Sequence, residues 1–390
     1  MGGQGPRILT MNTETPIYLD HNATTPIHPD VVDAMLPYLR EHFGNPSSSH
    51  IYGRRAHDGV ARARGQVAGL LGCDDDEVIF TSGGTEANNL AIRGVVEARS
   101  ERRHVVTTVI EHPATERPCA WLERYGTRLT RIGVDVDGRA RVNEARAAIG
   151  ADTALVTVMH SNNETGVLQP VLEFTKLAHA AGAILHTDAA QSVGKVALNV
   201  RELGVDLLSV AGHKLYAPKG VGALYVRRGT PLVPFVLGAG HERGLRPGTE
   251  NVASIVGLGM ACEIAGRDME SVSARLTDLR DELWDRLESA VPAIQLNGHR
   301  GLRLPNTLNV RFPRASGNAI LEGAPEITAS TGSACHAGAE SASGVILAMG
   351  VAPDEAVGSI RLTLGRGTTP ADIVTAADAL ARSWRGARRS

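Results

Sequence analysis

The chain has 390 residues, 43% of them hydrophobic and 21% charged, which fits a globular protein long enough for two domains. A formal net charge of −2 argues against strong nonspecific binding to nucleic acid. Four cysteines are too few for a disulfide framework, and neither a membrane span nor a signal peptide is recognisable. We therefore expect a cytoplasmic protein that binds neither membranes nor nucleic acid directly, with a disordered segment at 1–16.

Helices are expected at 29–42 and up to residue 71, and alternating strands and helices follow from residue 77. The expected strands are 78–81, 104–110, 128–134, 154–160, 184–187, 207–210 and 223–226. The helices expected between them are 85–98, 113–125 and 172–181. This alternation predicts a mostly parallel sheet with helices on both faces.

A stretch rich in glycine and proline, 237–248, ends this alternation. After it we expect helices at 251–264 and 269–287, strands at 307–312, 327–331 and 360–364, and a last helix after residue 370. The pattern predicts a large domain at 17–264 and a smaller α+β domain at 265–390.

Lys214 lies in a turn of small residues directly after the apolar run 205–210. Ligands of α/β proteins usually bind where strands end, so a lysine at this place is a candidate functional residue. Burial lowers the pKa of such an amine, which can then form a Schiff base. The alternative is an exposed lysine in a glycine-rich turn.

Three other motifs also follow predicted strands. Ser82–Glu86 combines small residues with a helix N-terminus, which suits a phosphate, although Thr85 could simply cap the helix. His112 could stack on a flat ring or transfer a proton, or it could cap the next helix. Asn163 could donate to a ring oxygen or a carboxylate, or it could hold a turn.

Asp188 directly follows the strand 184–187. A carboxylate beside a pyridine nitrogen keeps that nitrogen protonated, so the ring can withdraw electrons from an attached amino acid. A helix-capping aspartate is the alternative. Because a phosphate-binding turn, an imidazole, a carboxylate and a lysine all arise at strand ends of one sheet, their combination favours a pyridoxal-phosphate site.

The sequence resembles the cysteine desulfurases, pyridoxal-phosphate enzymes of the class V aminotransferase family with the aspartate aminotransferase fold (fold type I). The motifs that carry the resemblance occur in the family's order: Leu19–Pro26, Ser82–Asn89, Glu111–His112, Asn162–Gly166, Asp188–Gln191, Gly212–Gly220, Arg246–Asn251, Ser330–Cys335 and Ile360–Arg366. The resemblance implies an α/β large domain with a mostly parallel seven-stranded sheet, and a smaller α+β C-terminal domain that carries a nucleophilic cysteine.

The resemblance also implies roles for the matching residues. Lys214 would hold pyridoxal phosphate as a Schiff base, and Asp188 would pair with the ring nitrogen. The other expected cofactor contacts are Gly84, Thr85 and His213 at the phosphate, His112 and Asn163 at the ring, and Gln191 at the ring oxygen. Thr249 would complete the phosphate site of a neighbouring subunit, which implies a homodimer. Arg361, with Asn163, would bind the carboxylate of the substrate, a task that suits a planar guanidinium.

Cys335 follows a segment of small residues, whereas Cys73, Cys119 and Cys262 lie in or beside predicted helices and are interpreted as buried. Exposure permits the thiolate state that nucleophilic attack requires. The resemblance implies that this thiolate takes the sulfur of L-cysteine as a persulfide and leaves alanine. The sulfur would pass to an acceptor protein of iron–sulfur cluster assembly, tRNA thiolation or DNA phosphorothioation.

His112 is the third expected catalytic residue, after Lys214 and Cys335, because it could help to deprotonate the substrate thiol. No metal ion is expected in the site. Two positions depart from the family: Ala211 stands where serine is common, and Cys335–Gly338 lacks the threonine and serine of the better-known branch. The alternatives are another class V enzyme, such as a selenocysteine or cystine lyase or an aminotransferase, and a non-catalytic scaffold.

Overall fold

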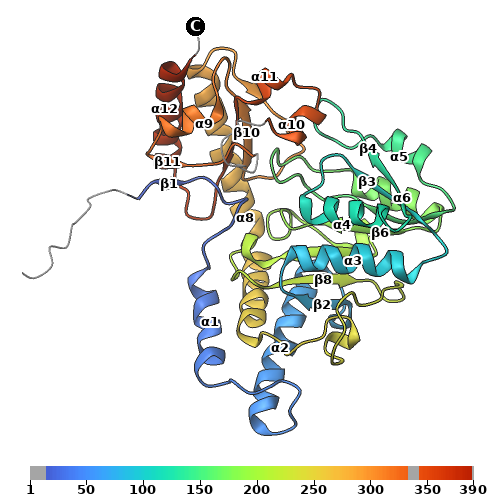
Figure 1. The fold of residues 1–390 in the computed structure, drawn as a ribbon. Coiled ribbons are helices and arrows are strands. Elements are labelled where there is room, and N and C mark those ends of the chain that lie inside the picture. Colours follow the sequence, from blue (N-terminus) through green and yellow to red (C-terminus); the bar gives the residue numbers. More distant parts are fainter. Residues whose placement is uncertain (1–14, 333–341, 389–390) are drawn as a thin grey trace, which may run out of the picture.

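The computed structural model describes residues 15–332 and 342–388 (Figure 1). Its largest sheet has seven strands, in the order β2 (Val78–Thr81), β8 (Gly222–Val226), β7 (Leu207–Ala211), β6 (Ile184–Asp188), β5 (Thr153–Thr157), β3 (His104–Thr108) and β4 (Arg128–Ile132). Strand β8 is antiparallel to both of its neighbours, and the other neighbouring pairs are parallel. The predicted α/β class with a mostly parallel seven-stranded sheet is confirmed.

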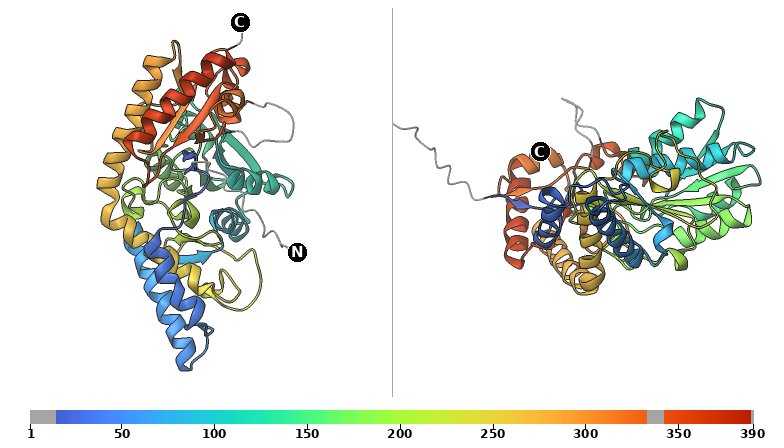
Figure 2. Two further views of the ribbon diagram at one scale, coloured as in Figure 1. Left: turned by 90° about the vertical axis from the view of Figure 1, so that its left-hand side faces the viewer. Right: turned by 90° about the horizontal axis from the view of Figure 1, so that it is seen from below.

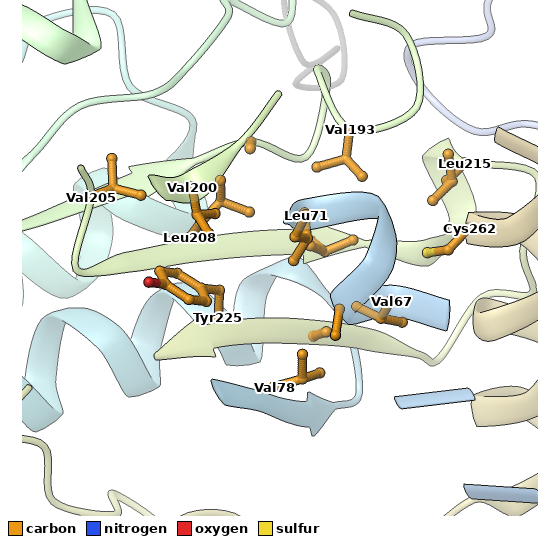
Figure 3. Close-up of a cluster of buried hydrophobic side chains, with 14 of the residues drawn as sticks. Val67, Leu71, Val78, Val193, Val200, Val205, Leu208, Leu215, Tyr225 and Cys262 are labelled. Carbon is orange, nitrogen blue, oxygen red and sulfur yellow. The ribbon is translucent and has the colours of Figure 1, made fainter. Parts of the chain in front are cut away.

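Every residue of β2, β3, β5, β7 and β8 is buried, as expected for strands that are covered on both faces. The helices that accompany this sheet are α3 (Gly84–Ala98), α4 (Pro113–Glu123), α5 (Val142–Ala148), α6 (Val171–Ala180) and α7 (Val200–Leu203). Figure 3 shows part of the core on one face of the sheet, where side chains of the strands meet those of α2 (Ile51–Leu71) and α8 (Val252–Ala290). The labelled residues there include Val67, Leu71, Leu208, Tyr225 and Cys262.

A second core lies in the C-terminal part of the chain. It is built on the antiparallel sheet β9 (Gln295–Leu296), β10 (Thr307–Arg311) and β12 (Ser359–Thr363) and on the parallel pair β1 (Ile17–Tyr18) and β11 (Ile327–Thr328). Helices α9 (Gly317–Glu322) and α12 (Pro370–Ala387) pack into this core. Helices α10 (Gly344–Ala348) and α11 (Pro353–Ala356) contribute instead to a separate small cluster with Ile110, Val134 and Met159. The pairing of β1 with β11 places the start of the described chain beside its C-terminal part (Figure 1).

The helix α8 (Val252–Ala290) connects the two cores. Two separate helices, 251–264 and 269–287, were expected here, and that expectation was wrong. Residues up to Ala265 pack into the first core, and those from Leu276 onward pack into the second, so the buried face changes partner while the backbone continues. The single Gly266 between them is not enough to end a helix, since glycine costs only about 1 kcal/mol.

Figure 2 shows α8 running from α1 (Pro29–Arg40) and α2 (Ile51–Leu71) toward α12, and it contacts all three helices. The predicted division into domains at 264/265 falls inside this helix and stays a prediction. The predicted disorder of residues 1–16 falls almost wholly outside the described residues. In the described ranges, no helix is long and apolar enough to cross a bilayer.

The strands β2, β3, β5, β6 and β7 run in the same direction, so their carboxyl ends meet at one edge of the sheet. Every motif that was singled out at a strand end therefore lies at this edge. In open α/β sheets this edge is the usual place for a ligand.

Candidate active site

One cavity at this edge brings together eight of the predicted site residues. They are Gly84, Thr85, His112, Asn163, Asp188, Gln191, His213 and Lys214. Thr249 and Arg361 do not line the cavity, and Cys335 lies outside the described residues. The structure therefore assembles the expected cofactor contacts, while their individual roles stay predictions.

The turn that was predicted to bind a phosphate forms the N-terminus of α3. Gly83, two residues before Thr85, is the N-cap, and its φ of 149° favours glycine. Thr85 therefore lies inside the helix and does not cap it. A Cβ at Gly84 would lie 3.2 Å from the Cβ of Ala211. The missing side chain keeps this end of the helix open, where free N–H groups and the helix dipole favour an anion.

Asp188 ends β6 and is almost buried, with 7% of its surface exposed. Its Oδ1 accepts a hydrogen bond from the backbone N–H of Ala190 at 2.9 Å, and its Oδ2 accepts one from Asn88 Nδ2 at 2.7 Å. Asn88 also donates to Thr115 Oγ1 at 3.1 Å. The sequence analysis did not single out Asn88, although it lies within the motif Ser82–Asn89 and one helical turn after Gly84.

His112 is the N-cap of α4, and its Nδ1 accepts the N–H of Ala114 at 3.1 Å. Burial, with a smaller effect of Lys214, lowers the pKa of His112. The ring is then neutral at pH 7 with its hydrogen on Nε2, so Nδ1 accepts the hydrogen bond from Ala114 and Nε2 is a donor. Stacking on a ring is compatible with this geometry, and the proposed help in deprotonating a thiol stays a prediction.

Lys214 follows β7 in a short turn, Gly212–Lys214, and burial lowers the pKa of its amine. The turn is held by the N-terminal part of the chain, because the carbonyl of His213 accepts the backbone N–H of Thr25 at 2.9 Å and its hydroxyl at 3.1 Å. Burial and the nearby Lys214 lower the pKa of His213 to about 4, so its ring is neutral near pH 7. The amine is thus placed at the cavity by a rigidly anchored turn.

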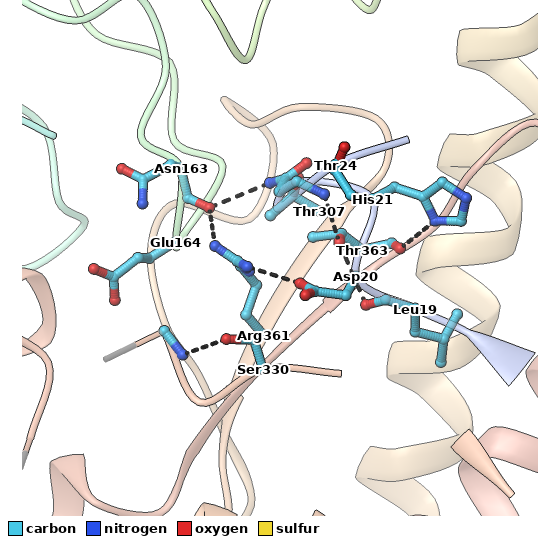
Figure 4. A network of polar contacts seen from close by, with 12 residues as sticks. Leu19, Asp20, His21, Thr24, Asn163, Glu164, Thr307, Ser330, Arg361 and Thr363 are labelled. Carbon is cyan, nitrogen blue, oxygen red and sulfur yellow. Dashed lines mark hydrogen bonds and ion pairs between the residues drawn. The ribbon is translucent and has the colours of Figure 1, made fainter. Parts of the chain in front are cut away.

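Arg361 lies in β12, and Figure 4 shows it beside Asn163, which lines the cavity. Its Nη2 forms an ion pair with Asp20 Oδ1 at 2.7 Å, and its Nη1 donates to the carbonyl of Asn163 at 3.1 Å. Its Nε is buried and has no hydrogen-bond partner among the described residues. The guanidinium is therefore held in place beside a cavity residue and retains donor capacity.

Thr249 is exposed and lies in the stretch between β8 and α8. The neighbouring Arg246 forms an ion pair with Glu86 of α3 at 2.9 Å, so this stretch runs beside the helix whose N-terminus opens the cavity. Completion of another subunit's phosphate site by Thr249 stays a prediction.

Glu111, the residue before His112, has a buried carboxyl group. Its Oε1 accepts the Thr108 hydroxyl at 2.7 Å and the N–H of Met159 at 3.0 Å, while its Oε2 has no partner among the described residues. Burial raises the pKa of Glu111 from 4.5 to about 8. The carboxyl is therefore largely neutral at pH 7 in the folded protein.

Replacing Glu111 with glutamine should make stability less dependent on pH. Below pH 4.5 the carboxyl is neutral in both states, but between pH 4.5 and 8 only the unfolded chain ionises, which favours unfolding. The stability that the buried carboxyl contributes is thus lost as the pH rises toward 8. Between pH 5 and 8 the variant should gain on the order of 3 kcal/mol over the wild type in the free energy of unfolding.

Denaturant unfolding at several pH values measures this difference. Glu173→Gln, an exposed change in α6, is the control and should show no comparable gain. Parallel pH profiles for the wild type and Glu111→Gln would contradict the expectation.

The cavity fits pyridoxal phosphate on the chemistry of its donor set. The end of α3 suits the phosphate, the Asp188 carboxylate suits a protonated ring nitrogen, and the amine of Lys214 suits an aldehyde. The buried Asn88 Oδ1, which has no partner in the described chain, is one further acceptor at the cavity. No group of three or more metal-binding side chains occurs in the ranges that the structure describes.

Comparisons with known proteins agree with this chemistry. Residues 17–375 match the family model of the class V aminotransferases. A cysteine desulfurase of Nostoc is 47% identical over 359 residues, which cover 92% of this chain and 90% of the relative.

Two solved structures are also similar. One is a NifS-like protein with a TM-score of 0.88 and 33% identity, over 94% of this chain and 99% of that one. The other is SspA in complex with cysteine, with a TM-score of 0.80 and 34% identity, over 90% of this chain and 99% of that one. The chain therefore belongs to the class V aminotransferase family and, within it, to the cysteine desulfurases, whose cofactor is pyridoxal phosphate.

Proposed function

We propose that the chain takes sulfur from L-cysteine, carries it as a persulfide on Cys335 and releases L-alanine. The observation that carries the choice of thiol is the environment of the other three cysteines, of which Cys119 and Cys262 are buried and Cys73, expected to be buried as well, is partly buried. Burial raises the pKa of Cys73 and of Cys262 to about 12, and it also raises that of Cys119. A thiol with a pKa of about 12 is ionised in roughly one molecule in 10⁵ at pH 7, so these three are poor nucleophiles.

Pyridoxal phosphate supplies an electron-withdrawing ring, which weakens bonds at the α-carbon of a bound amino acid. In the proposal, Lys214 holds the cofactor and its Nζ accepts the α-proton of the substrate. Asp188 keeps the ring nitrogen protonated, and Asn88 holds the carboxylate of Asp188 in that position. The lowered pKa of Lys214 supports its role, because a neutral amine can accept a proton.

Arg361 is proposed to bind the carboxylate of L-cysteine, with Asn163 beside it. The fixed guanidinium and its unpartnered Nε support this role. Binding requires the substrate carboxylate to share the guanidinium with Asp20. The similarity to SspA, whose structure is a complex with cysteine, supports L-cysteine as the substrate.

The sulfur transfer is proposed to occur at Cys335. Its thiolate attacks the sulfur of the substrate, so that one S–S bond forms and the C–S bond breaks. The carbon keeps the electron pair of the broken bond and takes up a proton to become the methyl group of alanine. Cys335 keeps the transferred sulfur, and no external oxidant or reductant is needed.

The proposal includes a homodimer in which Thr249 completes the phosphate site of the second subunit. It also includes a sulfur-acceptor protein of iron–sulfur cluster assembly, tRNA thiolation or DNA phosphorothioation. A reducing cytoplasm is the proposed location, in keeping with the three free cysteines in the described chain. Pull-down with the persulfide-loaded protein would identify the acceptor.

Product analysis tests the reaction. The purified chain, loaded with pyridoxal phosphate and given L-cysteine, should form alanine and a persulfide that appears only with cysteine. Pyruvate from cysteine, or alanine formed only from selenocysteine or together with a keto acid, would favour another class V enzyme. A chain that takes up no pyridoxal phosphate would favour a non-catalytic scaffold.

Replacing Ala211 with serine should tighten cofactor binding. Ala211 lines the cavity beside the open end of α3, and serine would add one hydroxyl donor toward the phosphate. A hydrogen bond to a charged group contributes about 1.5 kcal/mol or more, so the dissociation constant for pyridoxal phosphate should fall about 10-fold. Fluorescence titration measures the constant, and an unchanged or larger value would show that position 211 does not face the phosphate.

A further inference from the structure

Lys195 is a buried lysine that the mechanism above does not use. The chain has four lysines among its 40 Lys and Arg residues. Lys176 and Lys219 are exposed and Lys214 lines the cavity, but Lys195 is only 9% exposed and does not line it. A buried amine is costly unless it makes compensating contacts, so its partners indicate what it does.

The partners of Lys195 are amide oxygens. Its Nζ lies 3.1 Å from Oε1 of Gln191 and 3.4 Å from Oδ1 of Asn22. In the described ranges, no carboxylate lies within ion-pair distance of this nitrogen. Burial, together with the nearby charges of Lys214 and Arg361, lowers the pKa of Lys195 to about 7. The buried amine is thus compensated by hydrogen bonds to amide oxygens and not by a salt bridge within the described ranges.

These contacts determine which way the Gln191 amide points. Its Nε2 lies 3.0 Å from the carbonyl oxygen of Asn22, which can only accept a hydrogen bond. Its Oε1 faces Lys195, which donates. Two contacts of opposite polarity therefore fix the orientation of the amide. Gln191 lines the cavity, and the second N–H of its Nε2 is the hydrogen-bond donor that remains for a ligand in the cavity.

Asn22, the other partner, is itself held from several sides. Its Oδ1 also accepts Asn306 Nδ2 at 3.1 Å, and its Nδ2 donates to Thr307 Oγ1 at 3.0 Å and to the carbonyl of Asn163 at 3.3 Å. The side chain is 1% exposed. Lys195 therefore links Gln191 to a rigid group that also touches the loop of Asn163.

We propose that Lys195 is a positioning residue whose amine fixes the Gln191 amide, so that its free N–H faces the ring oxygen of pyridoxal phosphate. This rests on the proposed function to the extent that Gln191 contacts that oxygen. Lys195 itself touches neither cofactor nor substrate. Without it, Gln191 Oε1 loses its donor, and only the contact of Nε2 with the Asn22 carbonyl still orients the amide, so its free N–H is held less firmly toward the ring oxygen.

Lys195→Met in the full-length chain tests the proposal, because methionine keeps a long side chain without a donor. The dissociation constant for pyridoxal phosphate should rise about 10-fold, the loss of roughly one hydrogen bond. The visible absorbance maximum of the bound cofactor should also shift, since a donor to the ring is misplaced. The melting temperature should change little, because removal of a costly buried amine offsets the loss of the donor to Gln191 Oε1.

A double-mutant cycle shows whether Lys195 acts through Gln191. In a Gln191→Ala background, Lys195→Met should weaken cofactor binding less than 2-fold. The matched control Lys176→Met, at an exposed site, should leave both binding and spectrum unchanged.

Three results would overturn the proposal: wild-type binding and spectrum in Lys195→Met, full additivity with Gln191→Ala, or a lower melting temperature as the sole effect. A wild-type chain that binds pyridoxal phosphate but makes no alanine from cysteine would refute the proposed function alone. Because the cycle reads cofactor binding and the spectrum, it still decides the role of Lys195 in that case.

Discussion

Replacing Lys214 with alanine is expected to lower alanine formation from cysteine by at least about 10³-fold, because one amine both holds the cofactor and accepts the α-proton. Borohydride reduction of the wild-type holoenzyme, followed by peptide mapping, should place the pyridoxyl label on Lys214. The variant should carry no label. The chain has four lysines, and sequencing of the labelled peptide distinguishes Lys214 from Lys219, which is five residues away.

Lys219→Ala is the matched control, since this exposed lysine lies in the same loop five residues later. It should keep wild-type activity and labelling. A label on the buried Lys195, or activity that survives in Lys214→Ala, would remove the basis of the proposed mechanism.

Replacing Cys335 with serine should abolish persulfide formation and lower the rate of alanine production by at least about 10²-fold, while cofactor and substrate still bind. The sulfur then has no thiolate to attack it. Cysteine should still change the visible absorbance of the holoenzyme, because Lys214, Asp188 and Arg361 are intact. Mass spectrometry of the wild type after brief exposure to cysteine should show 32 Da of added mass, about one sulfur atom, on the peptide with Cys335.

Cys73→Ser is the control, because Cys73 is the least buried cysteine in the described chain. It should form the persulfide at the wild-type rate. Sulfide production by Cys335→Ser at the wild-type rate would show that the sulfur leaves by another route.

The sheet and the assembly of the cavity could be predicted from the sequence because both depend on local patterns. Apolar runs bounded by turns located the strands, and the carboxyl ends of parallel strands necessarily meet at one edge. Thr85, His112, Asp188 and Lys214 each follow such a strand, so their proximity followed from topology. Their functional and structural roles also coincide in part: His112 both caps α4 and lines the cavity.

The residues that hold this set in place could not be predicted in the same way. Asn88 meets Asp188 across 100 positions of sequence, and Asn22 meets Lys195 across 173. Such pairings depend on tertiary packing, and no periodic pattern in the sequence predicts them. The placement of Arg361 beside the cavity likewise depends on a strand of the second core.

The boundaries of α8 were mispredicted for a related reason. Hydrophobic periodicity shifts near residue 266 because the helix leaves one core and enters another, and a shift of this kind resembles a break. Local sequence gives no sign that the same helix supplies side chains to both cores.

The continuity of α8 has a mechanical consequence. Bending the chain at Gly266 would break several backbone hydrogen bonds of an otherwise regular helix. A hinge motion at this point that separates the parts of the chain around the two cores therefore costs free energy. Calorimetry is accordingly expected to show one cooperative unfolding transition, in which neither core stays folded after the other has unfolded.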